Sequence, residues 1–323
     1  MKLYILNKKN SYHHCVVLGN FRLFYNLNGD ERTPKIVEYS YHTQIPDYVI
    51  NLLKSFYEAY NIFTKIYKLN SPLEKGIYYE KGAKFIDIML VQIPVQKGLV
   101  AAELIDNFDM LKDDASMKGS AIRVLLDNNL ISNTATPIHE LFHVFQYSYC
   151  SFNNMWFMEG LARWAQNITH KRKDEKEILP QNEEELKTLL NRAHDAEHFW
   201  RRLINLIEDE KAFINKLLIN CAKEASGIEK MFIDKQRYTK NSWDKDEKKH
   251  PFNTRYIFKA ILNSAKESCS KKNSELDNFL ELLFKSIYAD IELFNTPQIQ
   301  RFLRVLRQID AKAVHEDDAV LYC

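Results

Sequence analysis

The hydrophobic pattern of this chain changes from strand-like to helix-like along its length. Five short apolar runs, bounded by Gly, Asn, Pro or charged residues, predict strands: 2–6, 15–29 (ending in an Asn-Gly-Asp turn), 35–41, 83–94 and 120–129. Between them, the segment Pro46–Tyr67 starts with proline and repeats apolar residues every three or four positions, which predicts an amphipathic helix.

The second half of the chain is predicted to be mainly helical. A helix begins at Pro137, with Thr136 as its expected cap, and a charge-rich connector follows over 170–185. Helical periodicity then continues from Leu186, interrupted by a polar loop over 234–251. We therefore expect an α+β fold with two parts. We expect residues 1–168 to form an N-terminal lobe that contains a β-sheet and a central helix, and residues 169–323 to form a mostly helical C-terminal lobe that closes the cleft between the two.

Composition restricts the classes of function. The net charge of the 323 residues is only +2, which gives no reason to expect a nucleic-acid or membrane partner. The five cysteines are scattered and never form a CxxC pair, which favours a reducing compartment. The N-terminus does not resemble a secretory signal, and no apolar run reaches the roughly 18 residues that span a bilayer. We expect a cytoplasmic protein, or one exported by a route without a classical signal peptide.

The predicted helix at 137 carries candidate metal chemistry in the sequence His-Glu-Leu-Phe-His. His139 and His143 are four residues apart, so both imidazoles lie on one face of the helix and can bind one ion. Glu140 lies about 100° around the helix from His139, where it can reach a metal-bound water without being a ligand. This HExxH arrangement supplies two ligands and a general base.

A catalytic zinc ion takes three protein ligands and leaves a fourth position for water. Glu159, within the apolar segment 155–164, is the candidate third ligand, and Gly160 beside it is expected to let this second helix pack closely against the first. The alternative is a structural helix with two boundary histidines and a glutamate that suits the helix dipole. The apolar neighbours of these charged residues favour the metal site, because buried ionisable groups need partners or an ion.

These two segments, "HELFHVFQ" and "NMWFMEGLARW", resemble the HExxH…EG-x-A pattern of the gluzincin metallopeptidases, the thermolysin-like group. The gap of 15 residues between His143 and Glu159 is shorter than in the best-known members. The resemblance implies a zinc-dependent peptidase, with His139, His143 and Glu159 as ligands of Zn²⁺ and Glu140 as the base. It also implies that the strand before the metal helix, Ala121–Asp127, lines the cleft and pairs with an extended peptide or protein substrate.

Gluzincins commonly supply a Tyr or His from the second lobe to stabilise the oxyanion, and the resemblance points to His194 within the segment 191–203 for this role. His198, Tyr238 and Tyr256 are weaker candidates. Cys150 is an alternative ligand, although a small buried residue is the simpler interpretation. We expect His13, His14, His170 and His250 to lie in solvent.

Two other functions stay open at this point. The protein could be a zinc hydrolase of a non-peptide bond, or a catalytically silent relative that uses the cleft for binding. The presence of Glu140 argues against the silent relative, because a binding module does not need the base.

Overall fold

The structure is a computed structural model of the chain. It describes the following residues: 1–6, 11–29, 32–33, 44–93, 97–105, 111, 114–130, 135–150, 152, 154–168, 177–233, 254–269, 271 and 273–288. The predicted strand 35–41 and the predicted polar loop 234–251 lie outside these residues.

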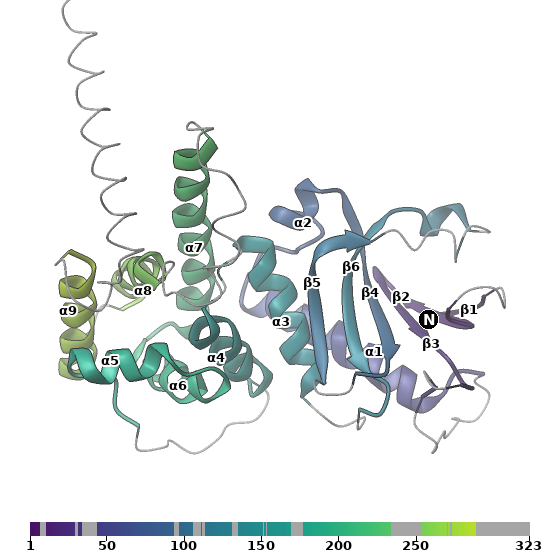
Figure 1. The fold of residues 1–323 in the computed structure, drawn as a ribbon, viewed down its shortest axis with the longest axis horizontal. Coiled ribbons are helices and arrows are strands. Elements are labelled where there is room, and N and C mark those ends of the chain that lie inside the picture. Colours follow the sequence, from purple (N-terminus) through teal and green to yellow (C-terminus); the bar gives the residue numbers. More distant parts are fainter. Residues whose placement is uncertain are drawn as a thin grey trace, which may run out of the picture.

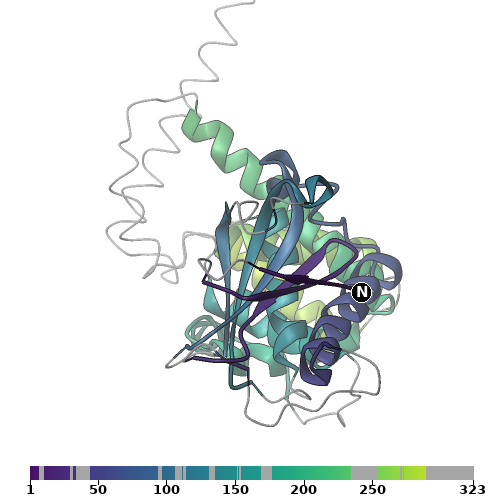
Figure 2. The same cartoon turned by 90° about the vertical axis from the view of Figure 1, so that its right-hand side faces the viewer.

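Six strands form one mixed sheet in the order β1-β2-β3-β4-β6-β5 (Figure 1). The strands are β1 (Lys2–Ile5), β2 (His14–Leu18), β3 (Phe21–Tyr25), β4 (Ala83–Val91), β5 (Gly98–Ile105) and β6 (Ser120–Asp127). Strands β3, β4 and β6 run parallel, whereas β1, β2 and β5 are antiparallel to their neighbours. The edge strand β1 lies nearest to the viewer in Figure 2.

The predicted run 15–29 is divided into two strands. Gly19 has a φ angle of +59°, and with Asn20 it makes the tight turn of the β2–β3 hairpin. Only a residue without a side chain adopts this left-handed conformation freely, so Gly19 fixes the place where the chain reverses.

The expectation that Ala121–Asp127 pairs with an extended substrate is wrong. This segment is β6, and it is hydrogen-bonded to β4 on one side and to β5 on the other. Its backbone groups are therefore already paired and cannot bind an extended peptide. The edge strand on this side of the sheet is β5, which the sequence pattern did not predict.

Three helices accompany the sheet: α1 (Asp47–Asn61, continued by a π-helical turn over Ile62–Ile66), the short α2 (Ile77–Glu80) and α3 (Thr136–Tyr149). Helices α1 and α3 pack on the sheet face that carries Leu23, Ile88 and Val124, and these residues belong to one large buried core. Helix α3 begins one residue earlier than predicted. Ala135 occupies the N-cap position, so Thr136 is the first helical residue and not the cap.

The remaining helices lie on the other side of α3 from the sheet (Figure 1). They are α4 (Met155–Gln166), α5 (Glu183–Leu190), α6 (Glu197–Leu206), α7 (Glu210–Ile233), α8 (Thr254–Ser268) and α9 (Ser274–Tyr288), with a 3₁₀ turn at His194–Ala196. A second 3₁₀ turn, Ala115–Met117, lies between β5 and β6 and contacts the sheet. Helix α5 starts inside the predicted charged connector, because the Asn182 side chain accepts a 3.0 Å hydrogen bond from the Glu185 amide and caps it.

The α+β class is therefore confirmed: the six described strands precede α3, and the described elements that follow α3 are all helical. The large core continues from the sheet through α3 and α4 to Leu283 of α9. The division of the chain at residue 168 stays a prediction. Among the described helices, none combines the length and apolar character required to cross a bilayer.

Candidate metal centre

Two histidines of α3 direct their Nε2 atoms toward the same point. His139 and His143 are one helical turn apart, and their Nε2 atoms are 3.1 Å from each other. The rings meet edge to face, with centroids 4.7 Å apart. Both side chains are buried, because α3 is enclosed between the sheet and the later helices.

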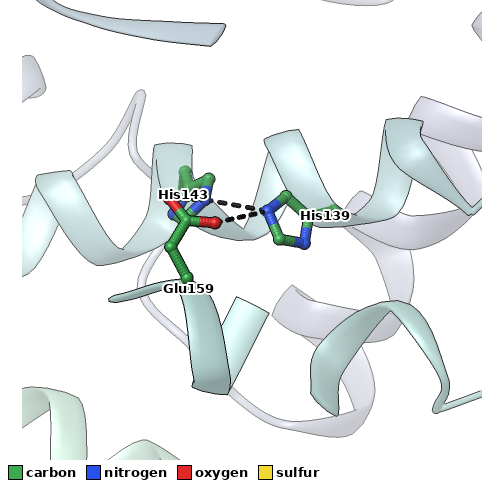
Figure 3. Close-up of side chains that lie close together, drawn as sticks. All are labelled: His139, His143 and Glu159. Carbon is green, nitrogen blue, oxygen red and sulfur yellow. Dashed lines mark hydrogen bonds and ion pairs between the residues drawn. The ribbon is translucent and has the colours of Figure 1, made fainter. Parts of the chain in front are cut away.

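Glu159 reaches the same point from α4. Its Oε2 atom lies 3.1 Å from Nε2 of His139, and its Oε1 atom lies 3.5 Å from Nε2 of His143 (Figure 3). The short connection between α3 and α4 places the second helix directly against the first. The structure thus brings the three predicted ligands together.

The spacing of these atoms fits one tetrahedral ion. Zinc lies about 2.0–2.2 Å from imidazole nitrogens and carboxylate oxygens, which at the tetrahedral angle places ligand atoms about 3.3–3.6 Å apart. The three separations here are 3.1, 3.1 and 3.5 Å. Two nitrogens this close cannot both carry a proton, so their lone pairs are suited to share a cation. The donor set His-His-Glu is also one that zinc prefers.

Gln146 supports the ligand cluster through hydrogen bonds to both α3 and α4. Its Oε1 atom accepts a hydrogen bond of 2.8 Å from the Nδ1–H of His143, so the neutral form of that ring has its lone pair on Nε2, directed at the centre. Its Nε2 atom donates to the Met158 carbonyl oxygen at 3.2 Å. The fully buried Gln146 therefore fixes the tautomer of one ligand and ties α3 to the turn of α4 that carries Glu159.

Glu140 lies outside the ligand cluster but beside it. Its side chain is buried against Gly98, the first residue of β5, where an added Cβ would lie 2.5 Å from the carboxylate. Burial raises the pKa of the Glu140 carboxyl to about 7. A carboxyl group with such a pKa can accept and return a proton near neutral pH, as a general base must.

The charges of the cluster depend on Glu159. Burial alone would raise the pKa of Glu159, but hydrogen bonds from His139, His143 and His194 outweigh burial and hold it well below its usual range. Burial lowers the pKa of His139. Burial also disfavours the charged form of His143, but the adjacent Glu159 carboxylate prevails and raises its pKa. Glu159 therefore stays in its ionised form, which is the form that binds a cation.

His194 lies at the same centre. It belongs to the 3₁₀ turn before α6, its Nε2 atom is 3.0 Å from Oε2 of Glu159, and its ring stacks on that of His139 with centroids 5.6 Å apart. The Glu159 carboxylate raises the pKa of His194. The predicted helix over 191–203 starts only at Glu197, so the His194 side chain is 60% exposed and faces the cleft.

Gly160 was expected to allow close packing of α4 against α3, but it allows close packing against a different element. The atoms nearest to a Cβ at this position belong to the 3₁₀ turn and α6 and not to α3: the Cβ of Ala196 at 2.7 Å and Cδ1 of Trp200 at 3.0 Å. The missing side chain therefore lets the 3₁₀ turn and α6 approach α4. This close approach places His194 beside Glu159.

The centre opens into a cavity of about 300 Å³. Besides the cluster, its lining includes side chains that we did not predict: Lys97, Gly98, Leu99, Val100, Thr136, Tyr147, Arg163 and Gln166. Tyr147 follows His143 by four residues, and Arg163 follows Glu159 by four, so helical periodicity was a usable signal for both. The signal for the β5 residues was absent, because they are distant in sequence from α3.

The other candidates lie away from the cavity. His14 is part of β2, His198 lies 3.7 Å from Glu177, and Tyr256 belongs to α8. Cys150 is fully buried at the C-terminal end of α3 and is not part of the ligand cluster. His170, Tyr238 and His250 lie outside the described residues.

Comparison with known protein families, with curated proteins and with solved structures finds no match to this chain. Any function must therefore be argued from the chemistry of the site.

Proposed function

We propose that this protein is a zinc-dependent metallopeptidase of the gluzincin type. The observation that carries the proposal is the set of ligand atoms of His139, His143 and Glu159, 3.1–3.5 Å apart, with the Glu140 carboxyl in the same cavity. A structural metal site has its full set of protein ligands and no base, whereas a hydrolytic site keeps one position open beside a base.

Each residue has a distinct task in this proposal. A zinc ion held by the three ligands would act as a Lewis acid and would lower the pKa of a bound water molecule. Glu140 accepts the proton of the attacking water and delivers it to the leaving amine. His194 is exposed at the cleft and can donate a hydrogen bond to the oxygen of the scissile carbonyl as that oxygen gains charge.

The edge strand β5 suits a peptide substrate. Its side toward β6 is paired, and its first residues line the cavity next to Glu140. An extended peptide can add to a sheet edge through backbone hydrogen bonds, and this places its carbonyl groups along the cavity. A hydrolase of a non-peptide bond would have no use for such an edge.

The free cysteines favour a reducing compartment. We propose that the protein acts in the cytoplasm, or that it is exported by a route without a classical signal peptide. Cys15, Cys150, Cys221 and Cys269 are all free thiols, and the first three are buried.

The test combines metal analysis with a digest of a peptide library. We expect one zinc per chain by elemental analysis, and cleavage of a subset of peptides that is abolished by a chelator and restored by zinc. Glu140→Gln is expected to keep the zinc and to lose turnover. Stoichiometric zinc with no cleaved peptide, or undiminished cleavage by Glu140→Gln, would contradict the proposal.

A further inference from the structure

Some of the charged residues around the cavity have a role in the proposed reaction, and others do not. Of the charged side chains that line the cavity, the two carboxylates, Glu140 and Glu159, serve as base and ligand. The two permanent cations, Lys97 and Arg163, have no part in that chemistry. A divalent ion balances the two carboxylates, so the two cations leave the loaded cavity with a net positive charge. Such a cavity attracts an anionic substrate.

Arg163 is the better placed of the two cations. It follows Glu159 by one helical turn of α4, so the Cβ atoms of the two residues are about 5–6 Å apart. Its Nε atom lies 3.6 Å from Oε2 of Glu197, which orients the guanidinium group, while the side chain stays 41% exposed. Lys97 lies just before β5, and its side chain is exposed. Among the described residues, no carboxylate pairs with it as Glu197 pairs with Arg163.

Glu197 orients Arg163 without neutralising it. The Glu197 carboxylate is 5% exposed and also pairs with Arg201, and its Oε1 atom accepts a 2.8 Å hydrogen bond from Asn167. Two arginines therefore share one carboxylate. Neither terminal nitrogen of Arg163 has a hydrogen-bond partner in the described part of the chain. A planar guanidinium held in this way can bind a carboxylate through two parallel hydrogen bonds.

We propose that Arg163 binds a carboxylate of the substrate within about two residues of the bond that is cleaved. The distance follows from its position one turn from Glu159 and from the rise of about 3.3 Å per residue of an extended peptide. The carboxylate is either an acidic side chain or the C-terminus of the peptide. This inference rests on the proposed peptidase function, and it assigns a substrate preference to the proposed active site.

The test measures binding separately from cleavage. Labelled tetrapeptides of Ala and Gly carry either Glu or Gln at each position in turn, and each is made with a free C-terminal acid or with an amide. Dissociation constants are measured on zinc-loaded Glu140→Gln protein, which is expected to bind without turnover. The peptides that the unmodified protein cleaves are then compared by kcat/KM.

We expect a Glu peptide or a free acid to bind about 10- to 100-fold more tightly than its Gln or amide partner, as one charge-assisted bidentate contact predicts. Arg163→Gln removes this preference but leaves the binding of the neutral peptides unchanged. Arg163→Lys retains part of it. Lys54→Gln, which removes an exposed charge from α1, serves as the matched control and keeps the preference. The Glu and free-acid series distinguish a side-chain carboxylate from a C-terminal one.

Two results would overturn the inference: equal binding of charged and neutral peptides, or a preference that survives Arg163→Gln. Its failure is distinct from failure of the proposed function. Cleavage without a carboxylate preference removes the role of Arg163 and leaves the peptidase intact. Arg163-dependent binding without any cleavage removes the peptidase and leaves carboxylate recognition.

Discussion

A Cβ atom on Gly98 would lie 2.5 Å from Oε1 of Glu140, so these two residues can touch only because position 98 has no side chain. They are 42 positions apart in the sequence and belong to β5 and α3. The contact places the sheet edge and the expected base next to each other, and it restricts the conformations open to the Glu140 carboxylate.

The first prediction concerns this contact. Gly98→Ala forces the Glu140 carboxylate away from its position and is expected to reduce kcat about 10²- to 10³-fold, within the usual contribution of a general base. The zinc content should not change, because no ligand is touched. Elemental analysis and steady-state kinetics on the same sample check both points. A Gly98→Ala protein with wild-type kcat would show that Glu140 does not need this position.

Glu159→Ala removes the carboxylate ligand. We expect zinc affinity to fall by at least about 10²-fold, because three protein ligands share the binding energy of the site. The measurement is a competition titration with a chromophoric chelator. If the variant competes for zinc as well as the unmodified protein does, the third ligand must be another residue, and Cys150 would be the first to examine.

Gln146→Leu keeps the volume of the side chain nearly constant but removes its hydrogen bonds to His143 and to the backbone carbonyl oxygens of α4. Loss of such a supporting partner typically weakens metal binding 10- to 100-fold. The same chelator competition applies, and the effect should be smaller than that of Glu159→Ala. An effect on thermal stability alone, with unchanged zinc affinity, would limit Gln146 to joining α3 and α4.

His194→Phe tests the proposed oxyanion donor. The side chain is 60% exposed, so its replacement should leave the fold intact. We expect kcat to fall about 10²- to 10³-fold with little change in KM or zinc content, as for loss of one donor in the transition state. A rise in KM with unchanged kcat would instead assign His194 to substrate binding.

Glu275→Gln tests an ion pair far from the centre. Hydrogen bonds from Arg202, one of them 3.0 Å long from its Nε atom, lower the pKa of Glu275 below its ordinary value of 4.5. The folded state therefore gains stability from this carboxylate above about pH 4.5, and loses it as the pH falls through the lowered pKa. The variant should melt about 1–4 °C below the unmodified protein at pH 7, and this difference should shrink as the pH falls below 4.5. A difference that is constant between pH 7 and pH 3 would contradict the assignment.

The parts of the site that follow a helical repeat could be predicted from the sequence. His139, Glu140 and His143 lie within five residues, so the regular helix determines their relative positions. Glu159 could be named because a charged residue in an apolar helix needs partners. Its distance to the histidines could not, because it depends on how α4 packs on α3.

The parts that depend on long-range packing were missed. The segment Gly98–Ile105 contains two alanines and no regular alternation of polar and apolar residues, so it gave little strand signal. Because β5 was missed, the strand that lines the cleft and pairs with substrate was expected to be Ala121–Asp127. Gly160 was recognised as a site of close approach, but the sequence does not encode which helix approaches it.

The packing around Gly160 also gives the protein an internal optical reporter. Directly behind this glycine the indole rings of Trp156 and Trp200 are stacked, 5.6 Å apart and within 2° of parallel, and Trp200 Nε1 donates to the Trp156 carbonyl oxygen. The electronic transitions of two indoles at this separation couple, and the circular-dichroism signal of the pair depends on their separation and on the angle between their transition dipoles. Trp200 belongs to α6, which continues directly from the turn that carries His194. A shift of that turn when a ligand enters the cleft would therefore change the spectrum of the unlabelled protein, and the motion could be followed in real time.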